Sequence, residues 1–178
     1  MAILPKTDLV TLTDALEALG DGLRRLFESI DWTSKRADFK RWHALRLKMT
    51  EFESLSVLVE TRRAGLEPAA ASTLKPWLDR LIYEVALRAL QAEARLAQVQ
   101  HDKREIPLFG RELFTQALRR LDRLMAQVKA TSPEPARDLL VLERAQHERK
   151  DLIELIHRAP QIPDFGARPS RREERVAA

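Results

Sequence analysis

The sequence predicts an all-α protein, an antiparallel up-and-down bundle of about five long helices followed by a flexible C-terminal tail. In several segments an apolar residue recurs at every third or fourth position, the spacing shared by helical bundles and coiled coils. Hydrophobic residues make up 44% of the 178 positions and charged residues 33%, and good helix formers such as Leu, Ala, Arg and Glu are abundant. All nine prolines lie at the edges of these segments, where a missing N–H does little harm.

The first helix is predicted over residues 7–30. Its apolar seam is formed by aliphatic residues three or four positions apart: Leu9, Leu12, Leu16, Leu19, Leu23, Leu26 and Ile30. Gly20 and Gly22 lie inside this segment, and each costs about 1 kcal/mol relative to Ala. We interpret them as points of close helix packing rather than as a hinge. Residues 31–34 form a short connection with Ser and Thr ready to cap the next helix.

The second helix is predicted over residues 34–63 and the third over residues 73–104. Residues 65–72 form a loop between them, and Pro76 is placed in the first turn of the third helix, where proline is tolerated. Both helices also carry apolar residues away from their seams, namely Leu47, Val57, Leu87 and Leu90. We interpret these two helices as a central pair covered by the others. The alternative is an extra apolar surface for a partner chain.

The fourth helix is predicted over residues 108–130, and the fifth from Ser132 to residue 158. Ser132 is read as the N-cap of the fifth helix, with Pro133 at its first helical position and Glu134 favoured by the helix dipole. Because the connections between helices one and two and between four and five are short, these helices are antiparallel neighbours. We therefore expect one domain over residues 1–158. Residues 159–178 contain three prolines and a run of charged residues and are predicted to be a flexible tail.

Composition excludes several classes of function. The chain has no cysteine, which excludes disulfides, thiolate metal sites and a cysteine nucleophile. No apolar run approaches the roughly 20 residues that span a bilayer, so no membrane association is expected. The N-terminal residues lack the basic and apolar regions of a signal peptide. These observations favour a cytoplasmic protein.

A basic segment precedes and enters the second helix. Residues 33–50 carry six cations against the single acid Asp38, and aromatic residues are interleaved among them. Cations can bind phosphates and aromatic rings can stack on bases, so this segment is a candidate nucleic-acid surface. The alternative, which we favour, is a solvated face of the helix. The candidate residues are Lys35, Arg36, Lys40, Arg41, Arg46 and Lys48, and a second cluster is formed by Arg119, Arg120 and Arg123.

Arg95 and His101 are separated by five residues near the end of the third predicted helix. An arginine followed by a histidine at this spacing in an all-helical bundle resembles the Rx4–6H signature of HEPN ribonucleases. The resemblance implies a dimer in which His101 assists proton transfer at an RNA 2′-hydroxyl and Arg95 stabilises phosphate charge. The chain departs from the family pattern at Leu96, where a polar residue is common.

Two further patterns on the fifth helix have ordinary explanations. Glu154 and His157 match one Glu-x-x-His element of di-iron bundles, but such sites need two elements and further carboxylates. We therefore expect no metal and no cofactor. Glu143, His147 and Asp151 share one face, and we interpret them as exposed intrahelical ion pairs rather than as a buried acid–histidine relay.

The resulting functional prediction is a non-catalytic helical interaction protein, acting as a subunit, adaptor or regulator of a larger assembly. A protein partner is expected, and a homo-oligomer and contact between nucleic acid and the basic face of helix two both stay open. The alternative is a HEPN-like ribonuclease using Arg95 and His101.

Overall fold

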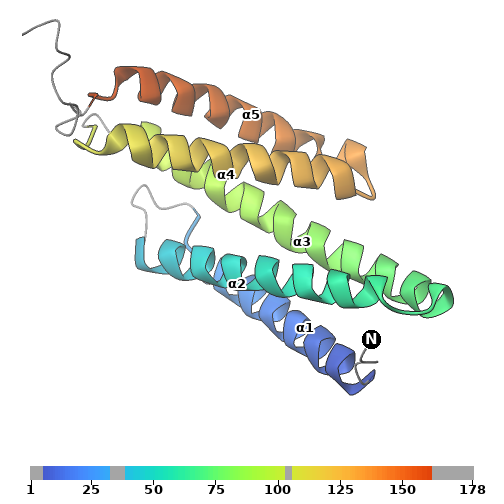
Figure 1. Cartoon of the computed structure of the whole chain (residues 1–178). Helices are drawn as coiled ribbons and strands as arrows, with labels where there is room; N and C mark the ends of the chain where they lie inside the picture. Colours follow the sequence, from blue (N-terminus) through green and yellow to red (C-terminus); the bar gives the residue numbers. More distant parts are fainter. Residues whose placement is uncertain (1–5, 33–38, 103–105, 162–178) are drawn as a thin grey trace, which may run out of the picture.

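The computed structural model of the chain describes residues 6–32, 39–102 and 106–161. These residues form five α-helices: α1 (Lys6–Glu28), α2 (Phe39–Ala64), α3 (Pro68–His101), α4 (Gly110–Thr131) and α5 (Pro135–Arg158). Consecutive helices run in opposite directions (Figure 1). The predicted all-α bundle is confirmed. Of the tail predicted over residues 159–178, Ala159 is instead buried in the core, and residues 162–178 lie outside the described residues. No helix in the described part is both long enough and apolar enough to cross a membrane.

Helix α3 is the centre of the molecule, because it packs against all four other helices. The α1–α2 hairpin lies on one side of α3 and the α4–α5 hairpin on the other (Figure 1). Among the described helices, neither α1 nor α2 packs its backbone closely against α4 or α5. The arrangement is therefore three layers, with a single helix as the middle layer.

The central position of α3 alone corrects the prediction that the second and third helices form a central pair. Leu90 of α3 is fully buried and Leu87 is half-buried, as a central helix requires. On α2, however, Leu47 is 55% exposed and Val57 is 66% exposed. Because α2 touches neighbours on one side only, its second group of apolar residues faces outward, and the prediction is right for α3 and wrong for α2.

Two helix starts also differ from the predicted ones. Helix α3 begins at Pro68, inside the segment read as a loop, and Pro76 lies within the helix. Pro68 fits the first helical position because it has no N–H to leave unsatisfied there. Ser132 is the C-cap of α4, and α5 begins at Pro135 with Glu134 as its N-cap. The predicted capping residues of α2 lie in 33–38, outside the described residues.

The core follows the predicted seams. Leu16, Leu23 and Ile30 of the first seam are buried, and its other leucines pack against the core partly buried. Gly20 is a point of close packing: a Cβ placed there would lie 3.0 Å from Cδ1 of Leu81 on α3. Small side chains also allow close helix packing along α3, where the buried alanines are Ala86, Ala89, Ala92, Ala94 and Ala97.

Candidate functional site

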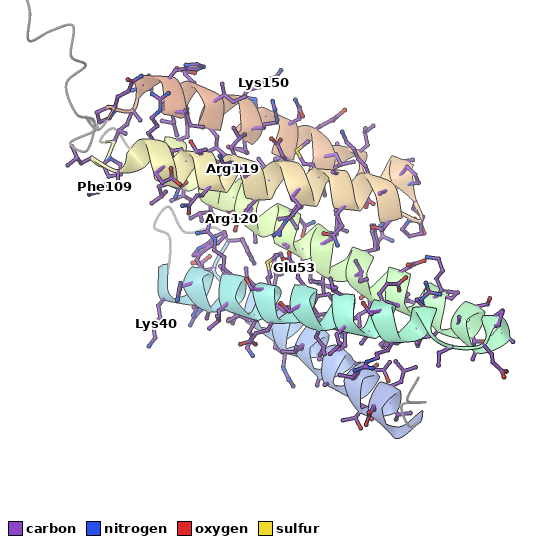
Figure 2. All side chains as sticks on the ribbon, in the orientation of Figure 1. Lys40, Glu53, Phe109, Arg119, Arg120 and Lys150 are labelled. Atoms are coloured by element: carbon purple, nitrogen blue, oxygen red, sulfur yellow. The ribbon has the colours of Figure 1, made fainter. Side chains whose placement is uncertain are left out.

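The four predicted basic residues that the structure describes do not form one continuous face. Lys35 and Arg36 lie outside the described residues. Lys40 and Arg41 are exposed at the beginning of α2, and Figure 2 shows Lys40 extending away from the bundle. Arg41 donates a hydrogen bond to the carbonyl oxygen of Ser29, just beyond the end of α1. Lys48 is half-buried. The cations described on α2 therefore point in several directions.

Arg46 turns inward and forms an ion pair with Glu93 of α3. Its Nε and one terminal nitrogen each lie 2.7 Å from a different oxygen of the Glu93 carboxylate. Nε of Arg120 on α4 lies 3.6 Å from the same carboxylate, which is only 5% exposed. Burial lowers the pKa of Arg120, although the charge of Glu93 opposes that shift. One buried carboxylate thus connects α2, α3 and α4 and holds two arginines that would otherwise repel each other.

A second ion pair closes the gap between α2 and α4. Arg123 donates to Glu53 over 2.9 Å, and Figure 2 shows Glu53 and Arg120 between these two helices. Of the second predicted basic cluster, Arg119 is exposed, Arg120 is half-buried and Arg123 is paired. Arg120 and Arg123 form part of the structural connection between the hairpins, which weakens the case for this cluster as a nucleic-acid surface.

Arg95 and His101 have different surroundings on α3. Arg95 donates to Oε1 of Gln98 over 2.5 Å, and Arg144 of α5 donates to the same oxygen over 2.9 Å. His101 is half-buried, and it faces Glu148 of α5, whose pKa it acts to lower. Because α3 stays helical through His101, six residues turn the chain by about 600°, or 240° net. The two side chains therefore leave the helix in different directions.

The polar stretch of α5 is exposed on one side and buried on the other. His147 and Asp151 are 3.6 Å apart, and the side chain of His147 is 73% exposed. Glu143 is also exposed, which agrees with the interpretation as surface ion pairs. Glu154 approaches Arg158 at 4.0 Å, and no group of metal-ligating residues gathers among the described side chains.

Sequence reasoning missed a buried polar cluster where α5 begins. The hydroxyl of Tyr83 on α3 lies 2.8 Å and 2.7 Å from the two carboxylate oxygens of Asp138. The hydroxyl of Ser132 also donates to this carboxylate, over 2.7 Å. Burial and the adjacent carboxylate raise the pKa of Tyr83 to about 12, so it stays a neutral donor. The only sequence signal for this buried hydrogen bond is that Tyr83 lies off the apolar seam of α3.

A second missed residue is Glu148, which is 3% exposed. Its Oε2 atom has no hydrogen-bond partner among the residues that the structure describes. Burial raises the pKa of Glu148, and repulsion from Asp151 raises it further. The sequence pattern concealed this burial because Glu148 lies among five other polar residues.

The side of α2 that faces away from the bundle carries large apolar side chains. Leu47, Val57 and Leu58 are exposed along the helix, and the exposed cations Lys40 and Arg41 lie at its beginning. We call this surface the α2 outer face.

Comparison of the chain with protein-family models, curated proteins and solved structures gave no match. The functional argument therefore rests on the geometry of the chain itself.

Proposed function

We propose that this chain is a non-catalytic helical interaction protein, a subunit, adaptor or regulator of a larger assembly in the cytoplasm. The observation that supports this proposal is the α2 outer face. Leu47 and Val57 are more than half exposed on a helix whose other side is packed in the core. Exposed apolar groups rimmed by charge are typical of protein–protein contact sites.

The geometry also favours a structural role for most of the charged side chains. Glu93 and Glu53 are occupied by arginines from neighbouring helices, and Asp138 is occupied by two hydroxyl groups. These groups hold helices together. The competing ribonuclease hypothesis would need Arg95 and His101 to converge on one phosphodiester.

Charged variants at positions of similar surface exposure test the α2 outer face. Leu47→Glu combined with Val57→Glu places charge on this face, and Val10→Glu places it on the similarly exposed Val10 of α1. We expect proteins that co-purify stoichiometrically with the wild type to be lost from the double variant and retained by the Val10 variant. Circular dichroism and urea denaturation serve to check that both variants fold. Equal retention by both variants would exclude the α2 outer face as the contact site.

Nucleic-acid contact is a second candidate function, favoured by the exposure of Lys40 and Arg41. Replacing Lys40, Arg41 and Lys48 with Gln should weaken binding and flatten the slope of log affinity against log salt by up to about three units. A matched control replaces Arg25, Lys129 and Lys150, which are exposed on other helices. Equal effects of the two triple variants would mean that any binding depends on net charge alone.

Catalysis is tested with the same preparations. We expect the purified protein to leave single-stranded RNA intact, because Arg95 and His101 point in different directions. RNA cleavage that is abolished by both Arg95→Ala and His101→Ala, with folding retained, would overturn the non-catalytic assignment.

A further inference from the structure

The exposed residues of α2 repeat with the spacing of a coiled coil. From residue 43 to residue 64, exposed positions follow one another at intervals of four and three in strict alternation. This is the spacing of the a and d positions that form the seam of a coiled coil. At 1.5 Å per residue the row extends over about 32 Å. We call it the outer seam, and its residues are His43, Leu47, Thr50, Ser54, Val57, Thr61 and Ala64.

The outer seam lacks the charges that an exposed row of a helix normally carries. None of its residues is an acid, a lysine or an arginine. An exposed row of α1 with the same alternating spacing contains Asp14, Asp21, Arg25 and Glu28, as expected of a surface that faces water. The outer seam therefore combines the exposure of a surface row with the composition of a contact.

The hydroxyl groups of the outer seam are satisfied within α2 itself. Thr50 donates to the carbonyl oxygen of Arg46 over 3.1 Å, and Ser54 donates to that of Thr50 over 2.9 Å. Thr61 donates to the carbonyl oxygen of Val57 over 2.8 Å. Because these donors already have acceptors, a helix that covered the seam would leave none of them unpaired. Their short side chains also leave room for larger side chains of that helix.

Charges accompany the outer seam on one side and at one end. Lys40 lies where the heptad places the next seam residue before residue 43, and it extends away from the bundle (Figure 2). Glu51 is exposed beside the middle of the seam. On the opposite side of the seam, the charged side chains of α2 are paired within the chain, as Arg46 is with Glu93. Lys40 and Glu51 are therefore the charges that a helix on the outer seam would meet.

These charges argue against a second copy of this chain as the occupant. In a parallel pair of copies each residue meets its own counterpart, so the two Lys40 side chains would face each other. An antiparallel pair that sets Leu47 against Val57 is centred at position 52, which brings the two Glu51 side chains together. Like charges in contact oppose association. A different partner can place opposite charges at both positions.

We propose that the outer seam pairs with one helix of a partner protein as a two-stranded coiled coil, in which a base of the partner meets Glu51 and an acid meets Lys40. This inference rests on the proposed function, because it names the kind of partner that the α2 outer face binds. Large apolar residues at the partner's a and d positions fill the space above the short side chains of the seam. The two charged pairs set the orientation of the partner helix.

The test uses a displayed library of helical peptides about four heptads long, with Leu at a and d and with Glu, Lys or Gln at the flanking positions. The library is selected against the full chain and counter-selected against Leu47→Glu combined with Val57→Glu. We expect enriched peptides to carry Lys and Glu about three helical turns apart, the separation of Glu51 and Lys40. Their affinity, measured by fluorescence anisotropy, should fall at least about tenfold in the double variant. It should be unchanged in Val10→Glu, which alters an exposed position of α1.

Charge reversal at Glu51 provides the sharper readout. A selected peptide whose Lys residues are changed to Glu should bind Glu51→Lys better than it binds the wild type, because the pair is restored with opposite signs. Glu143→Lys is the matched control, since Glu143 is exposed on α5 and its replacement changes the net charge equally. An equal gain in both variants would reduce the effect to net charge and overturn the pairing at Glu51.

The outcomes separate this inference from the proposed function. If no peptide is enriched, or if enriched peptides show no preference for these charges, the coiled-coil pairing is wrong. The proposed function is then still supported if co-purifying proteins are lost from Leu47→Glu combined with Val57→Glu, and it fails as well if they are retained. A wild-type dimer that the double variant converts to a monomer in sedimentation would assign the outer seam to a second copy of this chain and overturn the partner helix.

Discussion

At the scale of single residues, Glu148 is the position where burial and charge are most clearly in conflict. Its carboxylate is buried, one oxygen lacks a hydrogen-bond partner within the described part of the chain, and Asp151 repels its charge. Interactions with His147, Arg144 and His101 offset only part of this cost, because the pKa of Glu148 is still raised above the ordinary 4.5. The folded protein therefore holds the proton of Glu148 more tightly than the unfolded chain does.

This conflict predicts a pH-dependent effect of Glu148→Gln. Because the pKa is raised on folding, the contribution of Glu148 to stability is favourable below 4.5 and is lost as pH rises through the folded-state pKa. A neutral side chain of the same shape avoids the loss. We expect Glu148→Gln to increase the free energy of unfolding at neutral pH and to have a smaller effect at acidic pH. Urea denaturation at the two pH values measures both quantities.

The control for this experiment is Glu154→Gln, whose side chain is 63% exposed on the same helix. Substitutions at such surface positions usually change stability by less than about 0.5 kcal/mol. If Glu148→Gln instead destabilised the protein equally at both pH values, the carboxylate would be making an essential contact, and the assignment of an ionisation penalty would be wrong.

At the scale of helices, α1 shows how two similar residues come to differ through packing. Gly20 faces α3, with Leu81 3.0 Å from the position of an added Cβ. Gly22 has open space, and the nearest side-chain atom is Nζ of Lys48 at 4.0 Å. The sequence predicted close packing at both positions, and the structure confirms it only at Gly20.

These surroundings predict opposite consequences of adding a methyl group. Gly22→Ala should stabilise the protein by about 1 kcal/mol, because Ala has the higher helix propensity and meets no obstacle. Gly20→Ala should gain less or destabilise, since Leu81 has to move by a few tenths of an ångström. Chemical denaturation of the two variants side by side decides this. Equal stabilisation by both would mean that α1 and α3 are not in tight contact.

At the scale of the whole molecule, the two hairpins are joined by their packing on α3 and by a few ion pairs between side chains. Glu93 is the most connected of these, because it receives Arg46 from one hairpin and Arg120 from the other. Breaking a buried ion pair costs more than losing a surface pair, since the remaining charges are left without compensation.

We therefore expect Glu93→Gln to lower the free energy of unfolding by about 2 kcal/mol or more. It should also speed amide hydrogen exchange in α1 and α2 more than in α5, because the α1–α2 hairpin is held to the rest of the molecule by fewer neighbours. Arg123→Gln is the matched comparison: this side chain is 56% exposed in its pair with Glu53, and its loss should cost less than about 1 kcal/mol. If amide hydrogen exchange in Glu93→Gln changed equally in α1, α2 and α5, Glu93 would have no special role in joining the hairpins.

The sequence by itself determined the helical class, the number and order of the helices and the seams that form the core. These depend on local spacing: Leu16 and Leu23 fall on one side of α1 whatever their neighbours are. Even so, the predicted starts of α3 and α5 are several residues away from Pro68 and Pro135, which begin these helices. The sequence favours Pro76 in the first turn of the third helix and Pro133 at the first position of the fifth.

Only the tertiary structure decided which helix is central and which polar groups are buried. The apolar residues on both sides of α2 and α3 are equivalent in sequence, yet Leu90 is buried and Leu47 is exposed. Likewise Arg46 resembles its basic neighbours until α3 brings Glu93 to it, and Tyr83 meets Asp138 from 55 positions away. The physical reason is that helical periodicity is a local property, whereas burial and ion pairing depend on the angles at which whole helices meet.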